Sequence, residues 1–319
     1  MTDAVALKPA LQAEARDALQ RSVATLNQII LGKADKIDLA LTCLLAGGHF
    51  LIEDVPGVGK TTLARALAAV LGLEFARVQF TSDLLPADVT GVSVYQQGDG
   101  SFRFHPGPVF TQMLLADEIN RATPKAQSAL LEAMQERQVT VDGEAHRLPS
   151  PFFVVATQNP VDQIGTFALP ESQLDRFLMS TSLGYPDAES ERQLLSGHRP
   201  AATLDSQPAV LRPDAIRVLQ DAVTRVKVAD ALLDYLQSLI DYTRNSNMFI
   251  TGLSPRAAIA LTNAARAHAL LKGRDAVYPE DLQAVFVAVS GHRLQSTGAL
   301  ESASATDRAQ HVLDSVAIP

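Results

Sequence analysis

The sequence has few of the residues that build disulfide-linked or metal-stapled domains. Among its 319 residues there is no tryptophan and only one cysteine, Cys43, which excludes an internal disulfide. Cys43 lies in the apolar stretch "LALTCLLAGG", which predicts a small buried side chain. The histidines are scattered without the spacing of metal ligands, so we expect core or surface histidines and no structural zinc. They are His49, His105, His146, His198, His268, His292 and His311.

Long apolar runs and an excess of positive charge are also missing. No run approaches the roughly 20 apolar residues of a membrane span, and the first twenty residues mix acids and bases without an apolar core. We therefore expect no membrane span and a cytoplasmic location. Asp and Glu outnumber Lys and Arg by 35 to 27, and the basic residues do not cluster. Because this balance repels a polyphosphate backbone, nucleic acid is not an expected partner.

The chain does have enough apolar residues for a full core, at 47% of the total, and its length favours two domains. Over residues 1–185, short apolar runs alternate with helical patterns, which is typical of a βαβ parallel sheet, and we expect the first domain to span residues 1–198. Five runs, each followed by turn or cap residues, are the predicted strands. They are "HFLIE", "FARVQF", "MLLADE", "FFVVATQ" and "FLMSTSL".

The second half has a different pattern. Proline, alanine and small polar residues over 198–214 indicate a linker, and we expect residues 199–319 to form a smaller, all-helical domain. One of its helices should begin at Pro255 after the N-cap residue Ser254, and another at Pro279. The tail after Leu294 is small and polar, and we expect it to be partly mobile.

Two stretches interrupt the α/β pattern of the first domain. Near 91–105, alternating apolar residues flank Gly98-Asp99-Gly100, and near 138–148 they flank Asp142-Gly143. Both patterns predict β-hairpin inserts.

The stretch "EDVPGVGKTT" follows the first predicted strand and opens a helix, which is the context of a phosphate-binding loop. The strict pattern G-x-x-x-x-G-K-[ST] requires glycine where this chain has Asp54. Only positions with unusual backbone geometry demand glycine, and Gly57 and Gly59 are retained. Lys60 would contact the β and γ phosphates, Thr61 would ligate Mg²⁺, and the Asp54 side chain would point away from the nucleotide. The predicted nucleotide-binding residues are Pro56, Gly57, Val58, Gly59, Lys60, Thr61 and Thr62.

An acidic pair ends the third predicted strand. In "QMLLADEINRA", Asp117 and Glu118 lie at the carboxyl edge of the sheet, where parallel α/β folds bind their ligands. One carboxylate could hold the water shell of the metal and the other could polarise an attacking water. Acids often end apolar runs at a solvated turn, but their place about 57 residues after the phosphate loop favours the functional interpretation.

Polar residues also end the strand "FFVVATQNP". Thr157, Gln158 and Asn159 follow its apolar part, and the Asn159 amide could orient a water beside the γ-phosphate. The alternative is an Asn-Pro turn, which is common.

Two arginines complete the candidate set. Arg176 in "LPESQLDRFL" precedes the last predicted strand, and Arg256 is the second residue of the helix that Ser254 caps. Arginine at a helix N-terminus opposes the helix dipole, so a phosphate partner explains Arg256 better than a surface ion pair does.

Taken in order, "EDVPGVGKTT", "LADEINRA", "PKAQSALLEAMQERQVTVDG", "ATQNP", "LPESQLDRFL" and "SPRA" resemble the MoxR family of AAA+ ATPases over residues 29–292. This resemblance implies an α/β fold, an AAA+ P-loop αβα nucleotide-binding domain with a parallel sheet followed by a helical lid. It implies ATP and Mg²⁺ as cofactors, a ring homo-oligomer, commonly a hexamer, and remodelling of protein partners that often carry von Willebrand factor A domains. It assigns Walker A to Lys60 and Thr61, Walker B to Asp117 and Glu118, sensor 1 to Asn159, the arginine finger to Arg176 and sensor 2 to Arg256. The two hairpins resemble inserts of this clade.

The expected function is therefore Mg-dependent ATP hydrolysis coupled to rearrangement of a protein partner. Three other functions remain open at this point. A P-loop phosphotransferase would phosphorylate a small acceptor, a nucleic-acid motor or clamp loader conflicts with the acidic balance, and a regulatory module with a silent site conflicts with the intact Glu118.

Overall fold

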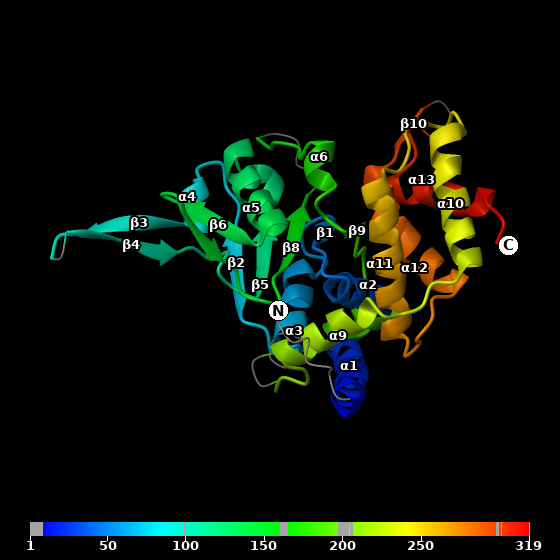
Figure 1. The fold of residues 1–319 in the computed structure, drawn as a ribbon, viewed down its shortest axis with the longest axis horizontal. Coiled ribbons are helices and arrows are strands. Elements are labelled where there is room, and N and C mark those ends of the chain that lie inside the picture. Colours follow the sequence, from blue (N-terminus) through cyan, green and yellow to red (C-terminus); the bar gives the residue numbers. More distant parts are fainter. Residues whose placement is uncertain are drawn as a thin grey trace, which may run out of the picture.

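A computed structural model of the chain describes residues 9–98, 100–159, 165–196, 204, 207–297, 300 and 302–318. Its centre is a five-stranded parallel sheet in the order β2-β5-β8-β1-β9 (Figure 1). The strands are β1 (Phe50–Glu53), β2 (Phe75–Gln79), β5 (Met113–Asp117), β8 (Phe153–Gln158) and β9 (Met179–Thr181). All five predicted strands are confirmed.

The central strands β5 and β8 are buried on both faces because helices cover the sheet on each side. Sheet residues such as Ile52 and Leu115 pack with α2 and α3 on one face, and Leu51 and Leu114 pack with α4 and α5 on the other. Cys43 lies in the first of these cores, as predicted, where burial raises the pKa of its thiol. The helices of this region are α1 (Pro9–Ile29), α2 (Ala34–Leu45), α3 (Lys60–Val70), α4 (Pro86–Thr90), α5 (Pro124–Glu136), α6 (Glu171–Leu174) and α7 (Ala188–Leu195), with a 3₁₀ turn, η1 (Ile119–Arg121).

The chain after the sheet is helical and lies beside the sheet domain (Figure 1). Ser254 caps α11 as predicted, its hydroxyl accepting a hydrogen bond from the Ala257 N–H at 3.1 Å. The described residues of the lid are helical except for connecting segments and a short antiparallel pair, β10 (Phe249–Thr251) with β11 (Gln295–Ser296). Its helices are α9 (Pro213–Val223), α10 (Asp230–Asn245), α11 (Pro255–Leu271), α12 (Pro279–Ser290) and α13 (Ala305–Ser315), with a 3₁₀ turn, η2 (Gly291–Arg293).

Part of the tail after Leu294, where we expect partial mobility, forms a helix that packs on the lid. Residues 305–315 form α13, whose first turn is closed by a capping box between Ser304 and Asp307. Ala309 and Val312 are fully buried against the lid. Apolar residues at helical spacing therefore pack a segment that is otherwise small and polar against the lid.

The lid shares one apolar core with the sheet domain. Lid residues such as Leu261 and Phe286 belong to the same buried cluster as Phe50 and Ile37, and α11 contacts α2 of the sheet domain. The predicted domain boundary at 198/199 falls within 197–203, outside the described residues, and stays a prediction. Within the described part of the chain, no helix is both long enough and apolar enough to cross a membrane.

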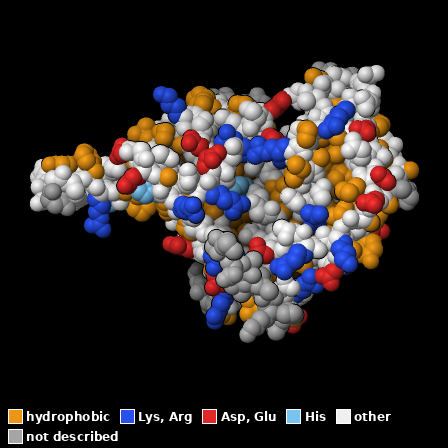
Figure 2. Space-filling model, viewed as in Figure 1, with side chains coloured by type: hydrophobic (Ala, Val, Ile, Leu, Met, Phe, Trp, Pro, Cys, Tyr) orange, Lys and Arg blue, Asp and Glu red, His pale blue; other side chains and the backbone are white. Residues whose placement is uncertain are grey.

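Antiparallel hairpins occur at both predicted places. The first pairs β3 (Gly91–Gln96) with β4 (Ser101–Pro106), and the second pairs β6 (Gln138–Val141) with β7 (Glu144–Arg147). The first hairpin extends from the body as an arm (Figure 1), and Figure 2 shows apolar side chains along its outer end. Phe104 of β4 stacks on His146 of β7 at 4.0 Å between ring centroids, which joins the two hairpins.

Candidate functional site

The phosphate-loop residues and the acidic pair meet in one pocket at the carboxyl edge of the sheet. Because all five strands are parallel, the residues that follow β1, β5 and β8 lie on the same edge. The pocket is lined by Pro56, Gly57, Gly59, Lys60, Thr61, Thr62, Asp117, Glu118 and Asn159. Of the predicted nucleotide-binding residues only Val58 is not part of the lining, and its partly buried side chain packs on the core.

The loop itself has the backbone geometry that its glycines allow. Gly57 and Gly59 have φ angles of 89° and 96°, a region that favours glycine, although a Cβ at either position would meet no atom within 4 Å. Lys60 opens α3 and its Nζ donates to the Asp54 carbonyl oxygen at 2.6 Å. Burial lowers the pKa of Lys60, and the carboxylates of Asp54, Asp117 and Glu118 oppose that shift.

The Asp54 carboxylate points away from this pocket, as predicted. Its oxygens accept hydrogen bonds from the backbone N–H groups of Val55 at 2.8 Å, Leu183 at 2.7 Å and Gly184 at 2.6 Å. Lys33 holds the same segment from its carbonyl side, since its Nζ donates to the Leu183 and Tyr185 oxygens, each at 2.7 Å. The residue that breaks the strict loop pattern therefore ties the loop to the chain that follows β9.

The acidic pair is held from β8. The Thr157 hydroxyl donates to Asp117 Oδ1 at 2.6 Å and accepts the Glu118 N–H at 2.9 Å. Glu118 adopts a left-handed backbone conformation with φ of 55° and ψ of 48°, which is uncommon for a non-glycine residue and is found at functional sites. Sequence reasoning had placed Thr157 at this edge without giving it a role.

Sequence reasoning missed three further side chains at the acidic pair. Arg77 of β2 donates to Asp117 Oδ2 from Nη2 at 2.7 Å and from Nε at 3.2 Å. Gln79 donates to Glu118 Oε2 at 2.8 Å, and Arg121 forms an ion pair with the same oxygen at 3.2 Å. Alternation along β2 places Arg77 and Gln79 on one face, but nothing in the sequence says that this strand pairs with β5.

Asn159 is 6% exposed at the end of β8 and lines the pocket beside Glu118. The Asn120 amide donates to the Asn159 carbonyl oxygen at 3.3 Å, which fixes the backbone there. The position suits an amide that orients a water.

Arg176 and Arg256 do not lie in this pocket. They line a second pocket together with Gly48 and Leu178, the residues near the start of β1 and β9. That pocket is therefore at the amino edge of the sheet, separated from Lys60 by the length of the strands, roughly 13 Å for a four-residue strand. We define the arginine pocket by its charged members, which are Arg137, Asp175, Arg176, Arg256 and Arg293.

Asp175 is the single carboxylate of the arginine pocket, and two lid arginines pair with it. Arg293 Nε donates to Asp175 Oδ1 at 2.7 Å, and Arg256 Nη1 lies 3.6 Å from Asp175 Oδ2. The Arg293 side chain is 7% exposed and also donates to the carbonyl oxygens of Asp175, Phe177 and Leu178. Desolvation by burial lowers the pKa of Arg293, and Asp175 opposes the shift. The lid thus fixes the backbone on either side of Arg176.

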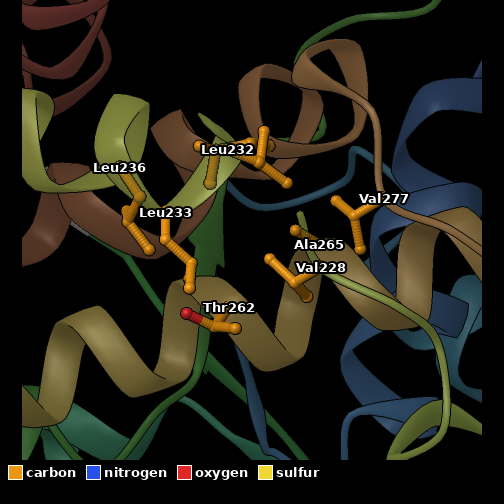
Figure 3. A pocket seen from close by; sticks show the side chains of 8 residues that line it. Val228, Leu232, Leu233, Leu236, Thr262, Ala265 and Val277 are labelled. Carbon is orange, nitrogen blue, oxygen red and sulfur yellow. The ribbon is translucent and has the colours of Figure 1, made fainter. Parts of the chain in front are cut away.

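A small hollow in the lid lies between α10 and α11 (Figure 3). Thr262 provides the only hydroxyl of its lining, and the remaining side chains are aliphatic. Without a titratable or charged group, this hollow offers no chemistry and is a feature of core packing.

Comparison with known proteins agrees with this arrangement. The family described as "ATPase family associated with various cellular activities (AAA)" matches residues 49–179, and the "AAA lid domain" matches residues 241–312. The protein YeaC of Bacillus subtilis is 44% identical over 97% of this chain and 98% of its own length. "Chaperone MoxR1" of Mycobacterium tuberculosis is 40% identical over 94% of this chain and 82% of its own length. A crystal structure of a candidate ATPase from Cytophaga hutchinsonii covers 97% of both chains with a TM-score of 0.87 at 34% identity. With a phosphate loop, an acidic pair and a helical lid in place, the chain belongs to the MoxR family of AAA+ ATPases.

Proposed function

We propose that this ATPase works as a ring homo-oligomer, in which Mg-dependent ATP hydrolysis drives the remodelling of a protein client. The observation that carries the proposal is the separation of the two pockets. Lys60, Asp117 and Glu118 form one half of a hydrolytic site, and the arginines that would neutralise the transferring phosphoryl group lie at the opposite edge of the same subunit. A ring joins the two halves, because one subunit's arginine pocket can face the next subunit's nucleotide.

The residues of the first pocket fit a magnesium nucleotide. Mg²⁺ prefers oxygen ligands, keeps several of its waters, and is usually held by one or two carboxylates together with substrate phosphates. The Thr61 hydroxyl and the Asp117 carboxylate provide such oxygens. When bound, the ion would neutralise charge on the β and γ phosphates.

Other residues of this pocket would act on the phosphates and the water. The α3 N-terminus and Lys60 would bind the phosphates. Glu118 would polarise the attacking water, and Asn159 would orient it.

The arginine pocket would complete the site of the neighbouring subunit. Arg176 and Arg256 share this pocket, so we propose that both act in trans, Arg176 as the finger and Arg256 as a second phosphate-binding cation. In GTPases, an arginine finger increases the hydrolysis rate by a factor on the order of 10³ to 10⁵.

The client is proposed to contact the β3–β4 arm. Tyr95 and Phe102 pack on each other at 5.4 Å between ring centroids, yet Phe102 is 71% exposed. Exposed apolar clusters of this kind mark protein contacts. Because one relative is named a chaperone, we expect the client to be a protein. The family resemblance adds that clients often carry a von Willebrand factor A domain.

Mixed rings test the trans assignment. Arg176→Ala keeps Lys60, Asp117, Glu118 and Asn159 intact, whereas Glu118→Gln spoils the site but retains a finger to lend. Each pure variant should be inactive, and mixtures should recover part of the ATPase rate because some interfaces contain every required group. The rate is measured against mixing ratio after co-assembly has been verified. If the ATPase rate stays at the inactive baseline at every mixing ratio, the trans assignment is contradicted.

The client contact is tested separately. Replacing residues 97–101 with a neutral linker should leave basal ATP hydrolysis unchanged and abolish client remodelling. Loss of both together would indicate that the arm packs against a neighbouring subunit instead.

A further inference from the structure

The Arg77 side chain places a positive charge directly beside the acidic pair. Its Nη2 and Nε both donate to one oxygen of Asp117, Oδ2, at 2.7 and 3.2 Å. The other oxygen, Oδ1, accepts the Thr157 hydroxyl. Both oxygens of the carboxylate that should hold the metal's water shell therefore already have a donor.

Arg77 also fixes Gln79, which together with Arg121 contacts the Glu118 carboxylate. Its Nη2 donates to Gln79 Oε1 at 3.1 Å, so the Gln79 amide nitrogen faces away from Arg77 and donates to Glu118 Oε2. One guanidinium thus sets the position of Asp117 directly and that of Glu118 through Gln79.

The ion pair between Arg77 and Asp117 can open. The Arg77 side chain is 49% exposed, whereas that of Asp117 is 11% exposed, and β2 is an edge strand of the sheet. A guanidinium on a long side chain at an open edge can turn into solvent at little cost, because water replaces its hydrogen bonds. The carboxylate cannot follow it, since Thr157 holds Oδ1.

We propose that Arg77 and Mg²⁺ compete for Asp117. Arg77 holds the carboxylate until the magnesium nucleotide arrives, and the bound ion displaces the guanidinium by taking its acceptor and repelling its charge. The ion pair then raises the Mg²⁺ concentration at which nucleotide binds. This inference rests on the proposed roles of Thr61 and Asp117 in holding the metal.

The experiment measures metal affinity and does not depend on turnover. Binding of a fluorescent ADP is titrated with free Mg²⁺, and binding of Mn²⁺ at saturating ADP is measured by electron paramagnetic resonance. Arg77→Met should lower the half-saturating Mg²⁺ and Mn²⁺ concentrations by roughly fivefold to tenfold, since it removes a unit charge within about 4 Å of the carboxylate. Arg77→Lys, which keeps the charge but not the paired donors, should fall between Arg77→Met and the wild type. Arg103→Met makes the same change of net charge on the exposed β4 strand and should have no effect.

Two results would overturn the inference. Unchanged metal affinity in Arg77→Met would show that the pair does not compete, and weaker metal binding would show that Arg77 supports Asp117 instead. Should Arg77→Met fail to fold, Arg77→Lys decides alone by the same criterion. Asp117→Asn checks the metal site itself. If the nucleotide affinity of the wild type does not depend on Mg²⁺ and Asp117→Asn does not change it, the proposed metal role of Asp117 is wrong. The inference about Arg77 is then wrong as well.

Discussion

The two pockets of this subunit are opposite in charge and in how they are held. The pocket at the carboxyl edge contains two carboxylates and one lysine, and a hydroxyl and an amide from neighbouring strands fix its acids. The arginine pocket contains four arginines around the single carboxylate Asp175, and the lid fixes its backbone. Around the middle of the face shown in Figure 2, lysine and arginine side chains lie between the sheet domain and the lid.

This difference fits the proposal that neither pocket suffices alone. The first has a phosphate loop and two acids, but its neighbouring arginines, Arg77 and Arg121, pair with those acids, whereas the second has the arginines and no phosphate loop. In parallel α/β folds the carboxyl edge is the ligand edge, so functional residues at the amino edge are unusual. They are reasonable if a second copy of the chain provides the ligand.

The largest expected effects separate two residues of the first pocket. Lys60→Ala should weaken ATP binding by about 10- to 150-fold, because it removes a charged donor to the ground-state phosphates. Glu118→Gln should leave ATP affinity nearly unchanged and reduce hydrolysis by about 10²- to 10⁴-fold, because the carboxylate acts on the water. Binding is measured by calorimetry and turnover by phosphate release. Equal loss of affinity in both variants would contradict the assignment.

Local sequence patterns predicted one pocket much better than the other. The phosphate loop and the residues at the ends of β5 and β8 are each specified by a short continuous run of the sequence, and parallel strands bring such ends together. The contacts of Arg77 and Arg293 join residues 40 and more than 110 positions apart, and no periodicity encodes them. The capping of α11 was predictable for the same local reason, whereas the anchoring of α13 depends on which surface Ala309 and Val312 meet.

The next effect compares two arginines on one carboxylate. Arg293→Met should lower the free energy of unfolding by about 3–5 kcal/mol, because it leaves Asp175 and several carbonyl oxygens without a buried donor. Arg256→Met removes the other partner of Asp175, at 3.6 Å and on a side chain that is 59% exposed, so it should cost at most about 1 kcal/mol. Urea unfolding measures the free energy of unfolding of both variants. Similar losses would show that the burial of Arg293 does not make its pair with Asp175 more stabilising than the pair of Arg256.

Acid should destabilise the protein through His49, which lines the arginine pocket. Its Nδ1 accepts the Val154 N–H at 3.0 Å and its Nε2 lies 3.3 Å from the Met134 carbonyl oxygen, which requires the neutral ring. Burial, with a smaller contribution from Arg137, lowers the pKa of His49 to about 4. Since the folded pKa is below the unfolded value of about 6.5, the unfolded chain takes up the proton first as pH falls.

The neutral His49 ring should therefore make its full contribution to the free energy of unfolding above pH 6.5. That free energy should fall by about 3 kcal/mol as the pH is lowered towards 4. Urea unfolding at pH 7.5, 5.5 and 4.5 measures the slope. His49→Asn should be less stable at pH 7.5 but lose less on acidification. His105→Asn, on the exposed β4 strand, should keep the wild-type slope, and an unchanged slope in His49→Asn would contradict the prediction.

The smallest expected effect concerns Asp54, where the phosphate loop departs from its strict pattern. Asp54→Gly restores the pattern but leaves the N–H groups of Leu183 and Gly184 without their acceptor, which should cost about 1–3 kcal/mol of unfolding free energy. Asp54→Asn should lose part of this, because its amide nitrogen cannot accept. ADP affinity should change by less than about threefold in both variants, since the N–H groups that would bind the phosphates are expected in residues 57–61 and the Asp54 carboxylate points away from this pocket. Urea unfolding and ADP titration test the two halves of the prediction. Much tighter ADP binding by Asp54→Gly would mean that the carboxylate repels the phosphates across the loop, so that Asp54 would act on the nucleotide as well as on the chain after β9.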